Sequence, residues 1–199
     1  MTPAARASAA IEVLADIAAR KRPAADALKD WGLAHRFAGS GDRAAIGNIV
    51  FDALRRRASF AYAMGDESPR ALVLRTLVSS WGLTPDDVAA LADGGRFAPP
   101  PLTPEEIEGL KRETPAEAPV SIRGDFPAWL EPQFERAFGI HAAEEGARLA
   151  ARAPVDLRVN TLKTARDKVL HALRRFDPAA TPHSPLGVRI AAGLGPSRS

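Results

Sequence analysis

The sequence contains no cysteine in its 199 residues. Without thiols the chain cannot form disulfide bonds, hold a metal ion through thiolates or use a cysteine nucleophile. Its four histidines, His35, His141, His171 and His183, do not show the spacing of metal ligands. We therefore expect no metal site in this chain.

Long hydrophobic runs are also missing. No uncharged stretch approaches the roughly 18 residues of a membrane-spanning helix. Glu12 and Asp16 interrupt the apolar N-terminal segment, which argues against a signal peptide. The composition, 46% apolar and 26% charged, is that of an ordinary globular protein with one large domain or two small ones. We expect a soluble, cytoplasmic protein with no membrane partner.

The net charge of +3 is small but unevenly distributed. Residues 1–80 hold 12 basic and 8 acidic side chains, residues 81–124 hold 4 and 8, and residues 125–199 hold 11 and 8. Two basic blocks around an acidic middle suit an RNA partner, because phosphate attraction is the general source of nucleic-acid affinity. A chain rich in alanine and arginine is equally expected from a GC-rich genome, so composition alone leaves both readings open.

Helical periodicity dominates the sequence up to the triple proline at 99–101. Apolar spacing, cap residues and prolines predict helices at residues 5–19, 24–31, 42–64, 69–81 and 84–92, with Thr84 as an N-cap. Thr103 and Pro104 open one more, acidic helix that ends before Thr114. The N-terminal part is thus expected to be an all-helical bundle.

Three consecutive arginines lie on the longest of these expected helices. On a continuous helical wheel Arg55 lies opposite the apolar stripe, Arg56 lies on its flank and Arg57 falls within it. We expect the stem of Arg57 to pack while its guanidinium snorkels or pairs with a carboxylate. Arg55 and Arg56 are candidate phosphate contacts, with an ordinary solvated helix face as the alternative.

A proline-containing connector at residues 113–124 marks the expected domain boundary, which gives domains at 1–112 and 125–199. After it, an amphipathic helix ends at Gly139, and we expect its aromatic residues Trp129, Phe134 and Phe138 to form core. Alternation then predicts a strand at 155–161, a helix at 165–176 with Thr164 as N-cap, and a strand at 187–191.

This β-α-β segment would cover one sheet face with its helix. The other face would display Arg158, Asn160 and Arg189. Neither strand carries an aromatic side chain for base stacking, so contact with the RNA backbone is the more plausible role of that face.

Three parts of the sequence resemble a known family. Residues 156–163 resemble the Leu-Arg-Val-Asn-Thr-Leu-Lys signature that precedes the catalytic domain in the Sun/Fmu (methyltransferase B) family of bacterial 16S ribosomal RNA (cytosine-5)-methyltransferases. Pro127, Trp129-Leu130, Phe134 and Phe138-Gly139 resemble the aromatic element before that signature. Gly41-Asp42-Arg43-Ala44, residues 50–55 and an Arg6-containing first helix resemble the NusB-like domain at the N-terminus of these enzymes.

The resemblance implies a mainly α fold, in which a NusB-like RNA-binding bundle precedes a small α/β segment of the RRM-like kind. Arg6 has an alternative role as decoration of the first helix, and Arg43 as an ion-pair partner of Asp42. The complete set of candidate RNA-binding residues, from the resemblance and from the charge pattern, is Arg6, Arg43, Arg55, Arg56, Arg158, Asn160, Lys163 and Arg189.

Full-length members of the family transfer a methyl group from S-adenosylmethionine to carbon 5 of a cytosine, after a cysteine thiolate attacks carbon 6. This sequence ends before the Rossmann-like domain and contains no cysteine, so the resemblance implies no catalytic and no cofactor-binding residue here. Gly193-x-Gly195 does not replace the cofactor loop, because no helix follows it.

The expected function is RNA positioning for such a methyltransferase, with 16S ribosomal RNA and the missing catalytic domain as partners. Two alternatives stay open: a stand-alone NusB-like RNA-binding module of the antitermination type, and a protein-interaction scaffold.

Overall fold

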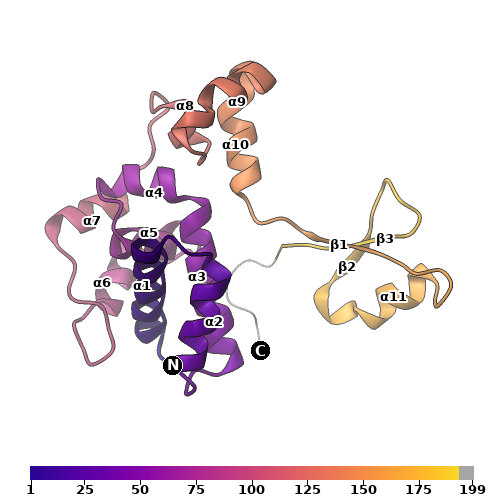
Figure 1. Cartoon of the computed structure of the whole chain (residues 1–199), viewed down its shortest axis with the longest axis horizontal. Coiled ribbons are helices and arrows are strands. Elements are labelled where there is room, and N and C mark those ends of the chain that lie inside the picture. Colours follow the sequence, from indigo (N-terminus) through magenta and orange to yellow (C-terminus); the bar gives the residue numbers. More distant parts are fainter. Residues whose placement is uncertain (193–199) are drawn as a thin grey trace. The chain divides into compact units, whose positions relative to one another are not determined.

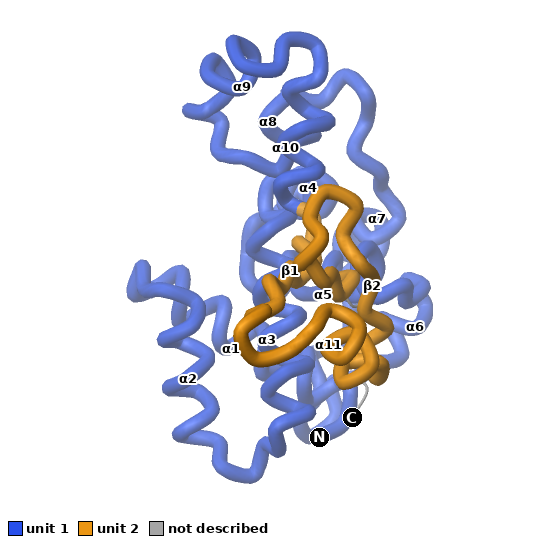
Figure 2. The backbone as a smooth tube through the Cα atoms, turned by 90° about the vertical axis from the view of Figure 1, so that its right-hand side faces the viewer, with its two compact units in different colours: residues 1–150, 194–199 blue, residues 151–193 orange. Residues whose placement is uncertain are grey.

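A computed structural model describes residues 1–192 of the chain, in two compact units that divide after Ala150. Figure 1 traces the elements along the chain, and Figure 2 colours the two units. The glycines of Gly193-x-Gly195 lie outside the described residues.

The first unit is helical, which confirms the mainly α prediction. Its short turns of 3-10 helix lie at Ala128–Leu130 and Gly139–His141. Its α-helices are α1 (Pro3–Arg20), α2 (Ala24–Ala34), α3 (Ser40–Arg55), α4 (Arg57–Met64), α5 (Pro69–Ser79), α6 (Pro85–Leu91), α7 (Pro104–Lys111), α8 (Val120–Arg123), α9 (Glu131–Phe138) and α10 (Ala142–Ala150).

Local sequence explains several helix starts. Thr84 accepts a hydrogen bond from Asp87 N, while the Asp87 side chain accepts one from Thr84 N, so the predicted N-cap is part of a complete capping box. Thr103 and Glu106 repeat this arrangement at the start of α7. In both helices a proline follows the cap, at the first position, where its missing N–H costs nothing.

The core lies where α1, α3 and α5 pack together, as Figure 1 shows. Val13, Ile46, Ile49, Val50 and Leu74 are fully buried there. They recur at helical spacing within their own segments, so each helix turns one apolar stripe toward the others. This packing positions the start of α4 and the loops around it.

The helix predicted at 42–64 is two helices, because the chain breaks at Arg56 (φ −116°, ψ 27°). The break changes the rotational phase, so the prediction that Arg57 lies in the apolar stripe is wrong. The Arg57 side chain is 59% exposed, and the expected pairing of its guanidinium with a carboxylate is confirmed by Glu67 at 3.1 Å.

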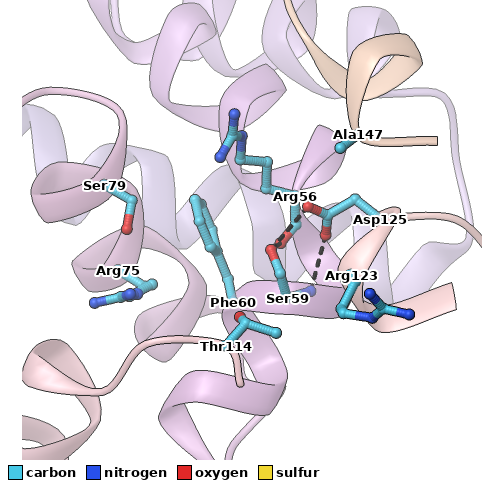
Figure 3. A pocket seen from close by; sticks show the side chains of 9 residues that line it. All are labelled: Arg56, Ser59, Phe60, Arg75, Ser79, Thr114, Arg123, Asp125 and Ala147. Atoms are coloured by element: carbon cyan, nitrogen blue, oxygen red, sulfur yellow. Dashed lines mark hydrogen bonds between the residues drawn. The ribbon is translucent and has the colours of Figure 1, made fainter. Parts of the chain in front are cut away.

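The new helix start has no cap from its own segment. Asp125, 66 residues further along the chain, supplies one: its Oδ1 accepts from Ser59 N at 2.8 Å and its Oδ2 from Ser59 Oγ at 2.8 Å (Figure 3). Burial raises the pKa of Asp125, although the hydrogen bonds from Ser59 act in the opposite direction. A carboxylate at this position satisfies N–H groups that a helix start leaves open.

Aromatic packing supports the α8–α10 part of the first unit. Phe126 stacks on Phe134 with ring centroids 4.0 Å apart, and Phe138 follows at 5.6 Å. Trp129 is 72% exposed and Phe138 is 40% exposed, so their predicted places in the core are wrong. Trp129 lies in the 3-10 turn before α9, where the predicted helical phase does not apply.

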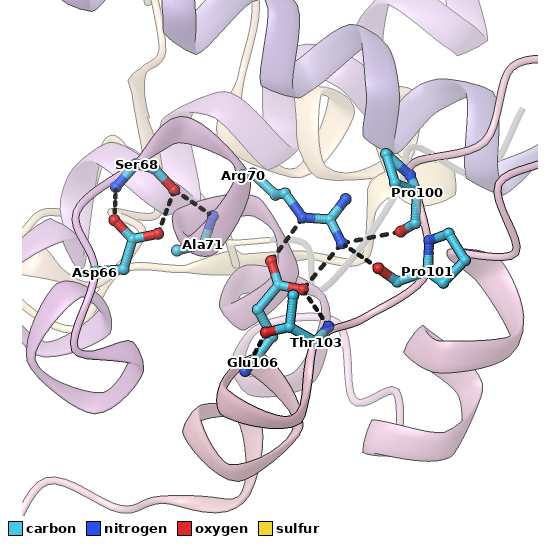
Figure 4. A network of polar contacts seen from close by, with 8 residues as sticks. All are labelled: Asp66, Ser68, Arg70, Ala71, Pro100, Pro101, Thr103 and Glu106. Carbon is cyan, nitrogen blue, oxygen red and sulfur yellow. Dashed lines mark hydrogen bonds and ion pairs between the residues drawn. The ribbon is translucent and has the colours of Figure 1, made fainter.

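A polar network joins α5 to α7 (Figure 4). Arg70 Nε donates to Glu106 Oε1 at 2.6 Å and Arg70 Nη2 to Glu106 Oε2 at 3.0 Å. The same Nη2 donates to the carbonyls of Pro100 and Pro101, at 2.9 and 3.2 Å. Arg70 therefore ties the loop between α6 and α7 to the bundle.

The second unit holds a three-stranded antiparallel sheet of order β1-β3-β2. Its elements are β1 (Val155–Arg158), α11 (Arg166–Ala172), a 3-10 turn (Arg174–Phe176), β2 (Pro178–Ala180) and β3 (Gly187–Ile190). The predicted order strand, helix, strand is confirmed, and β2 is an additional strand. Its three residues, Pro-Ala-Ala, lack the β-branched alternation that marks a strand.

The boundaries in this unit differ from the predicted ones. The first strand ends at Arg158 rather than at residue 161, and the N-cap of α11 is Ala165 rather than Thr164. Asn160 explains the early strand end, because its carbonyl accepts from Lys163 N and Thr164 N in a turn. Among the helices of residues 1–192, none is long and apolar enough to cross a membrane.

We predict that limited digestion with a nonspecific protease cuts first within residues 151–154. The two units divide there, and this stretch has neither helix nor strand. Residues 113–124, the boundary expected from sequence, instead include α8, which packs on α4 and α10. Mass spectrometry of the first fragments distinguishes the two sites, and initial cleavage between Pro115 and Pro119 would favour the sequence-based boundary.

We predict that Glu106→Gln lowers the free energy of unfolding by about 1–3 kcal/mol at neutral pH, the usual cost of losing a charged hydrogen-bond partner. Burial raises the pKa of Glu106, but hydrogen bonds from Arg70 and Thr103 N outweigh it, so the pKa lies below its usual value. This stabilisation is present above the unfolded-state pKa and is lost as the pH falls through the folded-state pKa.

Urea unfolding at neutral pH and near pH 3 measures the free energy of unfolding of the parent and of Glu106→Gln. On acidification this free energy should fall more for the parent than for the variant. Glu108→Gln is the matched control on the same helix, because Glu108 is exposed and only pairs with Lys111 at 3.4 Å. An equal loss for both variants would contradict the assigned role of Glu106.

Candidate nucleic-acid interface

Four of the predicted RNA-binding residues lie in each compact unit. Arg6, Arg43, Arg55 and Arg56 belong to the first, and Arg158, Asn160, Lys163 and Arg189 to the second.

The cations at the starts of α1 and α3 have structural partners. Arg6 Nε donates to Asp42 Oδ1 at 2.8 Å, and the Met1 ammonium donates to the same carboxylate. The ammonium and Arg6 together hold the pKa of Asp42 below its usual value. Arg43 Nε donates to the Ala38 carbonyl at 2.9 Å. The ion pair expected between Arg43 and Asp42 is thus replaced by one between Arg6 and Asp42.

Arg55 and Arg56 differ in their surroundings. Arg55 Nη1 donates to Asp52 Oδ1 at 3.0 Å, and its guanidinium carbon lies 5.9 Å from the centre of the Phe51 ring. Arg56 is exposed at the helix break and lines a pocket. Of the two, Arg56 is the one placed to meet an anion.

This pocket, which we call the arginine pocket, has a volume of about 290 Å³ and lies among α4, α5, α8 and α10 (Figure 3). Its single carboxylate is that of Asp125, which is bound to the start of α4. Its lining residues are Arg56, Ser59, Phe60, Arg75, Ser79, Thr114, Arg123, Asp125 and Ala147.

Arg75 is the least exposed of the three arginines. Its Nη1 donates to the Leu110 carbonyl, whereas its buried Nε has no hydrogen-bond partner among the described residues. Burial lowers the pKa of Arg75, and the charge of Glu113 acts in the opposite direction. A buried N–H group without an acceptor is costly. With three arginines and one carboxylate, the lining of the pocket carries a net positive charge.

Sequence reasoning did not include Arg75 and Arg123 among the candidates. Arg75 interrupts the buried run of residues 71–77, and a cation within such a run is a signal that could have identified it. Arg123 lies in the expected connector and donates from Nε to the Ala118 carbonyl at 3.0 Å. No sequence pattern places it beside α4.

In the second unit, Arg189 is not available as predicted. Asp156 faces it across the β1–β3 pair and accepts two hydrogen bonds, at 2.7 and 2.6 Å. The hydrogen bond from Arg189 holds the pKa of Asp156 below its usual value. Alternation puts Asp156 on the same face as Arg158, so the expected basic face contains a carboxylate that the prediction did not count.

Asn160 has a local role as well, because its Oδ1 accepts from Leu162 N at 3.1 Å and so stabilises the turn after β1. Arg158 and Lys163 are exposed on either side of this turn. They are the cations of the second unit that remain candidates. Within residues 1–192 no group of three or more histidines or carboxylates is arranged to hold a metal ion.

Residues 126–195 match the family model described as the ferredoxin-like domain of RsmF/B-like methyltransferases. No curated protein sequence matches the chain. The family match confirms the resemblance of the C-terminal part to the methyltransferase B family and links it to ribosomal RNA processing at the family level. The match does not extend to residues 1–125, for which the NusB-like assignment stays a prediction.

Proposed function

We propose that this chain, which carries the ferredoxin-like domain of an RsmF/B-like methyltransferase, binds and positions 16S ribosomal RNA for 5-methylcytosine formation. The observation that carries the proposal is the family match over residues 126–195. The exposed cations of both units support it, because a domain that positions RNA needs contacts to phosphates.

In this reaction, S-adenosylmethionine supplies the methyl group and a thiolate activates the cytosine. The 199 residues contain no cysteine, so the nucleophile would come from the partner catalytic domain. The residues of this chain would hold the RNA backbone while the target base reaches that domain. In this proposal the chain binds the RNA, and its partner domain carries out methyl transfer.

The RNA contacts are proposed at the arginine pocket of the first unit and at Arg158 and Lys163 of the second. Three arginines, Arg56, Arg75 and Arg123, line the pocket, against the single bound carboxylate of Asp125. Guanidinium groups suit phosphate oxygens because they present several N–H donors in one plane. The Arg6, Arg55 and Arg189 side chains contribute less, because each has a carboxylate partner.

We predict that Arg56→Gln combined with Arg123→Gln reduces the slope of log affinity against log salt concentration by about two units. Each lost phosphate contact removes about one unit from this slope, since fewer counterions are released on binding. Fluorescence anisotropy with a labelled 16S ribosomal RNA fragment at several potassium chloride concentrations measures the slope.

Arg57→Gln is the matched control, because it removes the same charge from the next residue and lies outside the arginine pocket. Arg55→Gln should change the slope less than Arg56→Gln, since Arg55 is already paired with Asp52. A slope that is unchanged in the double variant, with its fold verified by circular dichroism, would remove the arginine pocket from the RNA interface. Failure of the parent chain to bind the RNA would refute the proposed function itself.

A further inference from the structure

We infer that a groove between α1, α2 and the loop after α6 binds an unpaired nucleobase of RNA by stacking. The groove has a volume of about 720 Å³. One wall is the small-residue face of α1, with Ala5 and Ala9, and the other walls carry the rings of Trp31, His35, Phe37 and Phe97. We call it the aromatic groove.

Three of the rings form a continuous cluster. Trp31 and His35 stack with centroids 4.3 Å apart and an angle of 15° between their planes. His35 then meets Phe37 edge to face at 5.7 Å. Trp31 Nε1 donates to Glu12 Oε2 at 3.0 Å, and His35 Nδ1 lies 2.9 Å from the Trp31 carbonyl. The rings are therefore held in place before any ligand arrives.

The fourth ring reaches the groove from a distant part of the chain. Ser8 Oγ donates to the Phe97 carbonyl at 2.9 Å, which anchors the loop to α1. Within the loop, Gly94 adopts a positive φ of 73° and its N–H donates to the Pro99 carbonyl at 3.0 Å. The Phe97 ring thus lies on a braced loop.

Two of these rings are unusually accessible. Phe37 is 72% exposed and Phe97 is 67% exposed. Leaving a phenylalanine in water forfeits about 1.5–3 kcal/mol of burial energy, and exposed aromatic side chains that line one groove are typical of a binding site.

The charge beside these rings identifies the occupant. Phe37 follows Arg36 and Phe97 follows Arg96, both of which are exposed. The Arg96 guanidinium carbon lies 5.0 Å from the centre of the Phe97 ring. Aromatic rings interleaved with cations are the combination that binds single-stranded nucleic acid, because rings stack on bases while cations meet phosphates. The strands of the second unit carry no aromatic side chain. The aromatic groove therefore supplies the base-stacking rings that the sheet lacks.

This inference rests on the proposed RNA-binding function and adds a second component to it. Phosphate contacts weaken with salt, whereas stacking on a base does not release counterions. The aromatic groove should therefore give a preference for single-stranded over duplex RNA that persists at high salt. The arginine pocket gives no such preference.

The test uses the full chain with Phe37→Leu and Phe97→Leu combined, which keeps apolar side chains but removes the aromatic faces. We predict that affinity for a single-stranded oligoribonucleotide falls by about tenfold or more, since stacking on one ring commonly contributes that much. The slope against salt and the affinity for a duplex of the same length should stay unchanged, because no charge is lost. Trp129→Leu is the control, since Trp129 is equally exposed but lies outside the groove.

A second measurement changes the RNA instead of the protein. Replacing the bases of the oligoribonucleotide by abasic sites should weaken binding to the parent chain, and parent and double variant should then bind equally. Retention of parent affinity by the double variant, or equal loss for single strand and duplex, would overturn the inference. If the parent binds the RNA through arginine-dependent contacts while the phenylalanine variants behave like it, only this inference fails and the proposed function stands.

Discussion

The hydrogen bonds from Ser59 to Asp125 tie the α8–α10 part of the first unit to the helical bundle. They provide the start of α4 with a carboxylate cap from a segment 66 residues away, where the break at Arg56 leaves no local one. The cap fixes the segment after α8 against the bundle. The same break turns Arg57 outward and leaves Arg56 in the arginine pocket. One helix interruption thus sets both the packing of the later helices and the position of the candidate anion site.

Carboxylate partners determine which of the candidate cations can meet an external anion. Asp42, Asp52 and Asp156 pair with Arg6, Arg55 and Arg189, so these three arginines stabilise the fold locally. In the arginine pocket the single lining carboxylate, that of Asp125, is bound to the start of α4. The buried Nε of Arg75 has no acceptor among the described residues. Counting charges along the sequence cannot make this distinction, because it depends on which acid lies beside which base.

Local signals predicted most of the fold. Capping residues and apolar spacing gave the helices that begin after Thr84 and Thr103, and alternation gave the strand at residue 155. The signals failed where distant contacts decide: the break at Arg56 is capped by Asp125, and β2 exists only because β3 lies beside it. For the same reason the candidates drawn from the sequence include Arg56 but not Arg75 and Arg123, which line the same pocket. Ser8 and Phe97, which both line the aromatic groove, are 89 positions apart in the sequence. No local sequence pattern predicts that they meet.

A protein-interaction scaffold is the alternative to RNA binding that the acidic middle block, residues 81–124, would allow. Its carboxylates have other uses in the structure. Asp87 completes the capping box at Thr84, Asp93 accepts from Gly95 N in the loop that carries Phe97, and Glu106 holds Arg70. Carboxylates that are bound to helix starts and to an arginine repel phosphates less than their number suggests, because part of their charge is compensated locally. An excess of acidic side chains between two basic blocks is therefore compatible with an RNA-binding surface. In this segment those side chains cap helices, brace a loop and pair with Arg70.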